Sequence, residues 1–411
     1  MSPPRKQPFA WMHRRLADLE AAQLRRQVQP LLSQGMLLTD ALGNQLVNFG
    51  SNDYLGFGSQ PLTLSETGLD RREATGPSDQ GVALENTIRR GSGASGLVCG
   101  YSRFHDELAS RLATLEETEA AALYPSGYAA CSGSVTALAQ RGDLILSDAL
   151  NHASLIDGCR LSKAERFVYP HGDADAVEAL LRNHRRRFAN AWIVTDSIFS
   201  MDGTLASLQR LVEIADAHDA TLVVDEAHAT GVLGDDGSGL CAALGLKTRV
   251  PIRIGTLSKA IGSQGGFVVG PQVVIDYLLN HSRPLIYSTA ATPASVTAAL
   301  ASLRSISQDP RPREQVRQHS QRVRAGLRQM GFSTPELDSL EATIPIVPVR
   351  LGDASAALRA ATMLRAHGCY VPAIRPPTVP PGTSRLRISL SAAHSEAQID
   401  QLLAGLRQLR R

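Results

Sequence analysis

Two short stretches decide the fold: Gly255-Thr256-Leu257-Ser258-Lys259-Ala260, and Asp225-Glu226-Ala227-His228, whose aspartate lies 34 residues before Lys259. The first sets a lysine beside two hydroxyls and just before a glycine-rich run, 262–266. The second comes directly after the apolar run 221–224 and supplies a carboxylate and then an imidazole. In open α/β sheets, ligands bind outside the carboxyl ends of the strands. Both stretches are therefore expected to face one crevice.

The residue types at these strand ends are those that pyridoxal phosphate requires. A lysine with little solvent in reach has a lowered pKa and is a candidate for a covalent bond to an aldehyde. An aspartate can pair with a ring nitrogen of the cofactor. Lys259 and Asp225 are therefore predicted to bind pyridoxal phosphate. For Asp225 taken alone, a strand-end carboxylate that caps the next turn is the alternative.

Apolar runs that alternate with helical patterns predict the fold class. The expected strands are residues 144–147, 192–195, 221–225, 252–256 and 267–269. They are short, continuous and rich in β-branched residues, which suits strands buried on both faces of a parallel sheet. Between them, apolar residues recur at helical spacing. The alternation predicts an α/β domain of three layers, α/β/α, with a mostly parallel sheet.

A chain of 411 residues is expected to form more than one domain. The predicted divisions are an N-terminal helix and arm (1–60), a large cofactor-binding domain (61–300) and a small C-terminal α+β domain (301–411). The further elements expected are helices over 11–29, around 310–330 and from about 395, with strands at 344–349 and 386–390. The polar segment 66–90 is interpreted as an irregular excursion of unknown role.

Composition argues for an ordinary enzyme rather than a nucleic-acid or membrane protein. The net charge is +3, and 43% of the residues are hydrophobic. The densest basic run, 185–187, follows a helical pattern and is interpreted as a solvated helix end. No apolar run approaches the ~18 residues of a membrane helix, and no signal peptide is visible. The five scattered cysteines argue against a disulfide framework or metal site, so we expect a cytoplasmic location and no metal.

Two segments resemble nucleotide-binding motifs without the features that those motifs require. Asp225-Glu226-Ala227-His228 has the letters of the DEAH motif of RNA helicases, but the chain contains no Gly-x-x-x-x-Gly-Lys-[Ser/Thr] phosphate loop. The glycine-rich run 91–100 resembles a nicotinamide fingerprint, but the residues before it, 86–90, are not strand-like. Neither nucleotide chemistry is supported.

Two further segments follow expected strands. Ser126-Gly127-Tyr128 precedes the helical segment 129–140, and free N–H groups at a helix start can bind an anion. A simple helix cap is the alternative there, and Lys259 favours the phosphate site. His152 follows the strand at 144–147, where an imidazole could stack on a pyridine ring. A purely structural histidine is its alternative.

An ordered series of motifs resembles the α-oxoamine synthases, which are pyridoxal phosphate enzymes of aminotransferase fold type I. The resemblance runs from about residue 45 to the C-terminus. The motifs that carry it are Ser51-Asn52-Asp53-Tyr54-Leu55-Gly56, Gly91-Ser92-Gly93, Ser126-Gly127-Tyr128, Asn151-His152-Ala153-Ser154, Asp196-Ser197-Ile198-Phe199-Ser200-Met201-Asp202-Gly203, Asp225-Glu226-Ala227-His228-Ala229-Thr230-Gly231 and Thr256-Leu257-Ser258-Lys259.

The resemblance implies a role for each matching residue. Lys259 is similar to the Schiff-base lysine, and Asp225 to the aspartate that pairs with the pyridinium nitrogen. His228 and Ser200 resemble the residues beside the ring hydroxyl, and His152 the one stacked on the ring. The other matching contacts are, for the cofactor, Gly127, Tyr128, Thr256, Ser258 and Thr289, and, for the substrates, Arg25, Asn52, Thr378 and Arg387.

Some implied roles involve the neighbouring subunit or a choice between neighbours. The segment 287–289 is similar to one that reaches the phosphate from the partner subunit, which implies a homodimer with its active site at the interface. Arg387 resembles the arginine that holds the amino-acid carboxylate. Arg25 is the best match for an N-terminal substrate arginine, although Arg26 is one position away.

Within the family, the run Ile374-Arg375-Pro376-Pro377-Thr378-Val379-Pro380 is most similar to 8-amino-7-oxononanoate synthases of biotin biosynthesis. This resemblance implies L-alanine and a pimeloyl thioester, carried by CoA or by a carrier protein, as substrates. Two alternatives stay open: another α-oxoamine synthase such as glycine C-acetyltransferase, and a non-catalytic partner subunit. The presence of Lys259 counts against the second.

Overall fold

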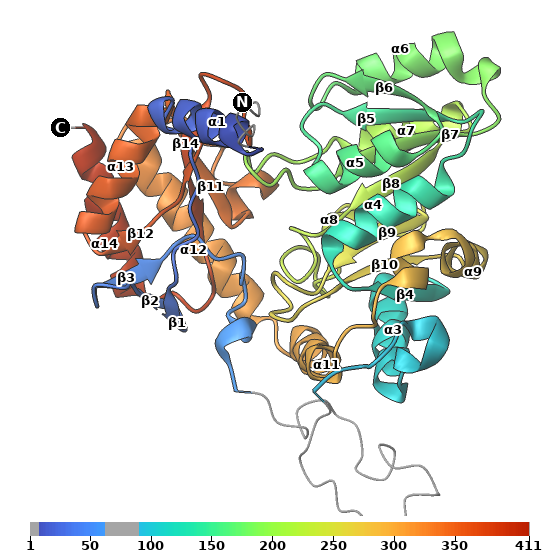
Figure 1. The fold of residues 1–411 in the computed structure, drawn as a ribbon, viewed down its shortest axis with the longest axis horizontal. Helices are drawn as coiled ribbons and strands as arrows, with labels where there is room; N and C mark the ends of the chain where they lie inside the picture. The colour runs from blue at the N-terminus through green and yellow to red at the C-terminus, as the bar shows by residue number, and fades with distance from the viewer. Residues whose placement is uncertain (1–7, 62–89, 411) are drawn as a thin grey trace, which may run out of the picture.

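The computed structural model describes residues 8–61 and 90–410, which form a larger and a smaller lobe (Figure 1). The polar excursion predicted over 66–90 lies outside the described residues, apart from its last position.

The larger lobe is built on a seven-stranded sheet in the order β4-β10-β9-β8-β7-β5-β6. Its strands are β4 (Ala120–Tyr124), β5 (Leu144–Asp148), β6 (Glu165–Tyr169), β7 (Ala191–Asp196), β8 (Thr221–Asp225), β9 (Ile252–Thr256) and β10 (Gly266–Gly270). Strand β10 runs antiparallel to β4 and β9, and the other neighbours pair in parallel. The predicted α/β fold with a mostly parallel sheet is confirmed.

Five of the seven strands match the predicted apolar runs, and two were missed for physical reasons. Strand β6 lies at the sheet edge and is largely exposed, so its sequence lacks a continuous apolar run. Strand β4 contains three alanines, which carry little β propensity of their own. Both strands owe their conformation to pairing with neighbours.

Helices cover both faces of this sheet. The helices are α3 (Arg103–Glu116), α4 (Gly127–Leu138), α5 (Ala153–Leu161), α6 (Ala174–His184), α7 (Leu208–Ala217) and α9 (Gln272–His281). Successive side chains of a strand point to opposite faces. Ile145 accordingly packs with α4, α5 and α9, whereas Leu144 and Leu146 pack with α3, α6 and α7. The three predicted layers follow from this alternation.

The smaller lobe contains two small sheets and three long helices. The sheets are β11-β14-β13 and β1-β2-β3-β12, with β1 (Leu32–Gln34), β2 (Leu37–Thr39), β3 (Gln45–Asn48), β11 (Ile346–Gly352), β12 (Cys369–Tyr370), β13 (Ala373–Ile374) and β14 (Ser384–Ser389). The helices are α12 (Arg311–Gln329), α13 (Ala354–Ala366) and α14 (Glu396–Arg407). Because β3 pairs with β12, the beginning and the end of the chain share one lobe.

The N-terminal helix α1 (Ala10–Ala21) lies against the smaller lobe (Figure 1) and is shorter than the predicted helix over 11–29. It ends at Ala21, Ala22 is its C-cap, and Gln23 then adopts a left-handed φ of 57°, which a helix cannot contain. The remaining elements are the 16-residue helix α11 (Pro293–Gln308) and the short η1 (Phe57–Ser59), η3 (Gly96–Gly100), η4 (Arg185–Arg187), α8 (Leu240–Ala243), α10 (Arg283–Tyr287), η5 (Leu340–Thr343) and η6 (Gln408–Arg410). The predicted boundary at residue 300 falls inside α11, and the division into three segments stays a prediction.

Within residues 8–61 and 90–410, no helix combines the length and apolarity needed to cross a membrane. The same residues contain no group of three or more histidine, cysteine, aspartate or glutamate side chains placed to hold a metal ion.

Candidate active site

Three neighbouring strands bring the predicted site residues to one edge of the large sheet. Asp196, Asp225 and Thr256 are the last residues of β7, β8 and β9. The register pairs Asp196 directly with Asp225. Lys259 follows β9 after a short turn, and the charges of Asp225 and Asp196 both act on it, so both carboxylates and the lysine lie at the same edge of the sheet.

Lys259 lies in a charged but poorly solvated position. Burial lowers the pKa of Lys259 to about 8, although the negative charges of Asp225 and Asp196 act in the opposite direction. The positive charge of Arg387 lowers this pKa further. A substantial fraction of the amine is therefore neutral near pH 8, as a nucleophile or a general base must be.

Asp225 is held by two hydrogen bonds from different elements. Its Oδ1 accepts from the backbone N–H of Ala227 at 2.8 Å, and its Oδ2 accepts from the Cys131 thiol of α4 at 3.1 Å. Asp225 is buried, and burial raises the pKa of Cys131, so the thiol stays protonated and can donate. The two bonds fix the orientation of the carboxylate.

His152 begins α5 and faces the same carboxylate edge. Its backbone N–H donates to Oδ2 of Asp196 at 2.6 Å. Its Nδ1 accepts from the backbone N–H of Ser154 and lies 2.7 Å from the Ser154 hydroxyl. Desolvation is the main reason why the pKa of His152 is lowered. The ring of Tyr128 lies edge-on to this imidazole, with centroids 6.3 Å apart.

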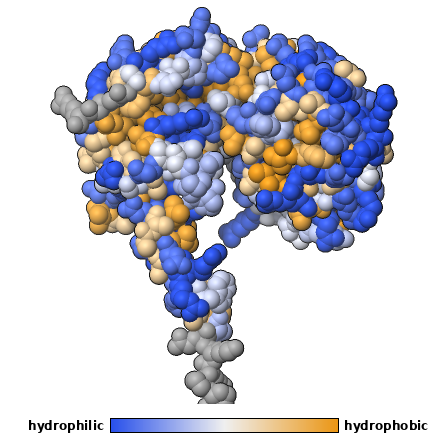
Figure 2. Space-filling view, turned by 90° about the horizontal axis from the view of Figure 1, so that it is seen from above, coloured by the Kyte–Doolittle hydropathy of each residue, from blue (hydrophilic) through white to orange (hydrophobic). Residues whose placement is uncertain are grey.

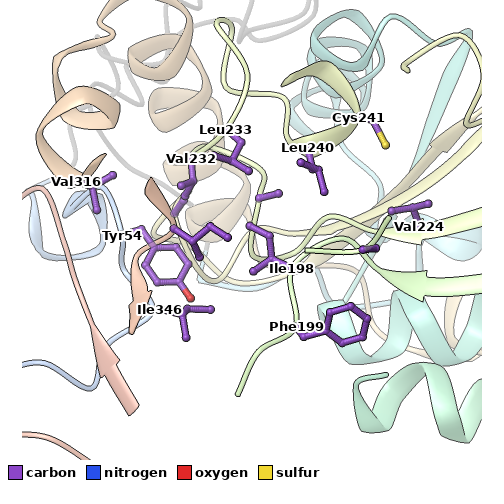
Figure 3. Close-up of a cluster of buried hydrophobic side chains, with 14 of the residues drawn as sticks. Tyr54, Ile198, Phe199, Val224, Val232, Leu233, Leu240, Cys241, Val316 and Ile346 are labelled. Atoms are coloured by element: carbon purple, nitrogen blue, oxygen red, sulfur yellow. The ribbon is translucent and has the colours of Figure 1, made fainter. Parts of the chain in front are cut away.

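His228 follows β8 and is in contact with Tyr54. The two atoms His228 Nδ1 and Tyr54 Oη are 2.7 Å apart, and both residues are buried. Burial, reinforced by the positive charges of Lys259 and Arg387, holds the pKa of His228 well below its usual range, so the imidazole is neutral. Figure 3 shows the Tyr54 ring among buried apolar side chains, with its hydroxyl turned away from Val316.

Arg387 comes from β14 of the smaller lobe and reaches across to the larger one. Its Nε donates to the backbone oxygen of Ser200 at 2.6 Å, and its Nη1 donates to Asn52 Oδ1 at 3.0 Å and to Ser389 Oγ at 2.6 Å. Nη2 donates to Tyr54 Oη at 3.4 Å. These bonds place a buried guanidinium among the other site residues.

The start of α4 and the end of β9 form a cradle that brings together the kinds of group that bind a phosphate. Gly127 is the first residue of α4, and a Cβ there would lie 2.9 Å from the Thr256 side chain. The hydroxyls of Thr256 and Ser258 are 2.8 Å apart. Backbone N–H groups at a helix start and hydroxyls are suitable donors to an anion. Together with Lys259, they fit pyridoxal phosphate.

Some predicted site residues lie away from this group within one chain. Thr289 is exposed, pairs with Ser95 in an isolated bridge, and lines a cavity of about 360 Å³ with Tyr101 and Leu285. Tyr128 is 46% exposed and its hydroxyl donates to Asp157.

The N-terminal arginines and the turn after β13 also lie outside the crevice group. Arg25 pairs with Glu20 at 3.1 Å. Its neighbour Arg26 donates to Thr378 Oγ1 at 3.0 Å. Of the two arginines, therefore, only Arg26 is bonded to the turn that carries Thr378 in this conformation.

Sequence reasoning did not assign a role to three residues of the site. Tyr54 stands inside a quoted motif, Asp196 was recognised only as a strand end, and Cys131 only as one of five scattered cysteines. The neighbourhood of Asn52 could have drawn attention to Tyr54. No local signal points to Cys131, because its contact with Asp225 spans 94 residues.

Comparison with known proteins agrees with this geometry. The family described as aminotransferase class I and II matches residues 44–406. An 8-amino-7-oxononanoate synthase of Anaeromyxobacter dehalogenans (strain 2CP-1 / ATCC BAA-258) is 43% identical over 398 residues, covering 96% of this chain and 94% of the relative. The 8-amino-7-oxononanoate synthase 2 of Bacillus subtilis (strain 168) is 40% identical, with 96% of each chain covered.

Solved structures show the same fold. A serine palmitoyltransferase of Sphingomonas wittichii has a TM-score of 0.85 and 28% identity, covering 98% of this chain and 97% of the other. A structure of 8-amino-7-oxononanoate synthase from Francisella tularensis has a TM-score of 0.69 and 25% identity, covering 88% and 97%. The chain belongs to the aminotransferase class I and II family, has the fold type I architecture and is a pyridoxal phosphate enzyme.

Proposed function

We propose that this family member catalyses the condensation of L-alanine with a pimeloyl thioester, with loss of CO₂ and release of the thiol, to give 8-amino-7-oxononanoate for biotin biosynthesis. The thiol is CoA or its equivalent on a carrier protein. The relatives that bear this enzyme's name, at 40–44% identity over nearly the whole chain, support the choice of reaction. The observation that carries the proposal is that the charges of Asp225 and Arg387 both act on buried Lys259, which places the three groups close together.

Pyridoxal phosphate, when bound, supplies an aldehyde for the amino group of the substrate and a ring that accepts the electron pair left at Cα. Lys259 would hold the aldehyde carbon, and Asp225 would keep a proton on the ring nitrogen. The N–H groups at the start of α4 would bind the phosphate with the hydroxyls of Thr256 and Ser258. His152 would lie over one face of the ring.

Arg387 and Lys259 would act directly on the amino acid. Asn52 and Ser200 hold the guanidinium of Arg387 in place through 3.0 Å and 2.6 Å bonds, and the Nη2 N–H that makes no bond to the described residues would donate a charge-assisted bond to the substrate carboxylate. Lys259, whose pKa is lowered to about 8, would act as the general base that removes the proton from Cα. With the carboxylate bound by Arg387 and the proton taken up by Lys259, Cα would be able to attack the thioester carbonyl.

The main alternative activity is the condensation of a different amino acid with a different acyl donor in the same site. The serine palmitoyltransferase structures, at TM-scores up to 0.85, share this fold over 98% of the chain. A steady-state panel of alanine, glycine and serine crossed with pimeloyl-, acetyl- and palmitoyl-CoA separates the candidates. The proposal expects the highest kcat/KM for alanine with pimeloyl-CoA, and a preference for glycine or serine would contradict it.

Lys259→Ala tests the catalytic assignment itself. Wild-type protein should keep a visible absorbance band from the bound cofactor through dialysis, and Lys259→Ala should lose both the band and turnover. Full turnover in this variant would show that another group acts as the base. A non-catalytic partner subunit, the remaining alternative, predicts no turnover even for the wild type.

We also propose a cytoplasmic homodimer in which Thr289 of each subunit completes the phosphate site of the other. Support comes from the exposed position of Thr289 beside exposed apolar residues, including Leu97, Val98, Tyr101 and Tyr287. Figure 2 shows apolar surface gathered in patches on the face it presents. A single chain leaves these residues in water, which favours contact with a second copy.

Mixed dimers test this sharing of residues. Lys259→Ala and Thr289→Ala subunits are each expected to be weakly active alone, whereas a mixture regains activity because hybrid dimers contain one intact site. Light scattering on the purified chain gives the oligomeric state. A monomer, or a mixture without regained activity, would contradict the proposal.

A further inference from the structure

Tyr54 lies where two halves of the site meet, although no role was assigned to it above. Its side chain is fully buried, and its hydroxyl contacts His228 Nδ1 at 2.7 Å, Asn52 Oδ1 at 3.2 Å and Arg387 Nη2 at 3.4 Å. The three partners come from different parts of the chain. A tyrosine ring held only for packing would not need its hydroxyl at this junction.

The hydrogen-bond roles follow from the donors and acceptors available. Arg387 has only donors, so the Tyr54 oxygen must accept from it. The single Tyr54 proton can then go to His228 Nδ1 or to Asn52 Oδ1. The histidine contact is shorter by half an ångström, and Asn52 Oδ1 already accepts from Arg387 Nη1. The proton therefore goes to His228.

This assignment fixes the tautomer of His228. An imidazole whose Nδ1 accepts a hydrogen bond carries its proton on Nε2. Among the described residues, Nε2 of His228 makes no hydrogen bond, so its N–H is available to a ligand in the crevice. Burial raises the pKa of Tyr54, which keeps the hydroxyl protonated as this arrangement requires.

We propose that Tyr54 is a positioning residue: its hydroxyl keeps the His228 proton on Nε2, where it donates to the bound cofactor, and at the same time holds the Arg387 guanidinium that binds the amino-acid carboxylate. The Tyr54 hydroxyl thus contacts both His228 in the cofactor half of the site and Arg387 in the substrate half. The inference rests on the roles proposed above for His228 and Arg387.

Tyr54→Phe tests the proposal, with Tyr124→Phe as the matched control. Tyr124 is also fully buried, but its hydroxyl donates to Ser282 at 3.1 Å, away from His228 and Arg387. Nitrogen-15 NMR of full-length histidine-labelled protein, with the His228 signal identified by its loss in His228→Gln, reports the tautomer directly. Wild type and Tyr124→Phe should show Nδ1 without a proton, and Tyr54→Phe should lose this single state.

Binding and kinetics provide the second readout. Leaving two buried polar groups without a partner is expected to weaken pyridoxal phosphate binding and to raise the amino-acid KM by about tenfold each, with a smaller change in kcat. Loss of packing alone would lower thermal stability without altering the tautomer.

The inference is overturned if wild-type His228 carries its proton on Nδ1, or if Tyr54→Phe keeps both the wild-type tautomer and the wild-type cofactor affinity. The NMR and cofactor measurements need no acyl thioester. Failure of the proposed condensation would therefore leave them interpretable, and an active enzyme with an unchanged tautomer would refute only the role of Tyr54.

Discussion

Arg387→Lys is expected to raise the KM for the amino acid while cofactor binding stays near the wild-type value. The substitution keeps a positive charge in the crevice, so the pKa values of Lys259 and His228, which Arg387 lowers, should change little. What the variant loses is geometry, because four of the five guanidinium N–H groups already donate to Ser200, Asn52, Ser389 and Tyr54, and an ammonium cannot keep these planar contacts and also donate to the carboxylate.

The magnitude follows from the bonds that the guanidinium makes. Arg387 is 4% exposed and already donates to Ser200, Asn52 and Ser389. Lysine has three N–H groups for these neighbours and the substrate together. Loss of one charge-assisted bond to the carboxylate costs about 1.5–3 kcal/mol, which is roughly 10- to 150-fold in kcat/KM.

Arg385→Lys is the matched control, two residues earlier on the same strand. Arg385 is 2% exposed, donates to the backbone of Thr383 at 3.0 Å and of Met201 at 3.2 Å, and pairs with Asp202. Both variants should lower the free energy of unfolding, measured by urea denaturation, but only Arg387→Lys should raise KM in a steady-state alanine titration. An unchanged KM in Arg387→Lys, or an equal rise in Arg385→Lys, would refute the reasoning.

Three further predictions concern the cofactor and the N-terminal arm. In cofactor-free protein, the rate of pyridoxal phosphate capture, followed by absorbance, should rise with pH and level off above the Lys259 pKa of about 8, because the neutral amine is the nucleophile. Asp225→Asn removes a negative charge that raises the pKa of Lys259, so the midpoint of this pH profile should move to lower pH. An unchanged midpoint would count against the electrostatic interaction between Asp225 and Lys259. Gly127→Ala should weaken cofactor affinity about tenfold in equilibrium dialysis, because the new Cβ would lie 2.9 Å from the side chain of the threonine at the end of β9. Wild-type affinity in this variant would show that the phosphate site can shift to accommodate the methyl group. Arg26→Ala should lower kcat/KM for the acyl thioester more than Arg25→Ala does, because only Arg26 bonds to the turn after β13; the reverse order would favour Arg25 as the substrate contact.

Much of the larger lobe could be predicted because its signals are local. Strands buried on both faces need largely apolar sequences, and β7 and β8 have them, whereas β9 also buries Arg253, which pairs with Glu116. The residues at their carboxyl ends were predictable for the same reason, since parallel strands present these ends at one edge. The exposed edge strand β6 and the alanine-rich β4 carry weaker local signals, and pairing with neighbours decides their conformation.

The positions of Asp225 and Lys259 could be predicted from the sequence alone, because Asp225 ends one five-residue strand and Lys259 lies three residues after another. The junction of Tyr54 with His228 and Arg387 was decided only by the tertiary structure. Its contacts span 174 and 333 residues and join the two lobes. Hydrogen bonds between distant segments depend on how the lobes pack, and no periodicity within either segment encodes that packing.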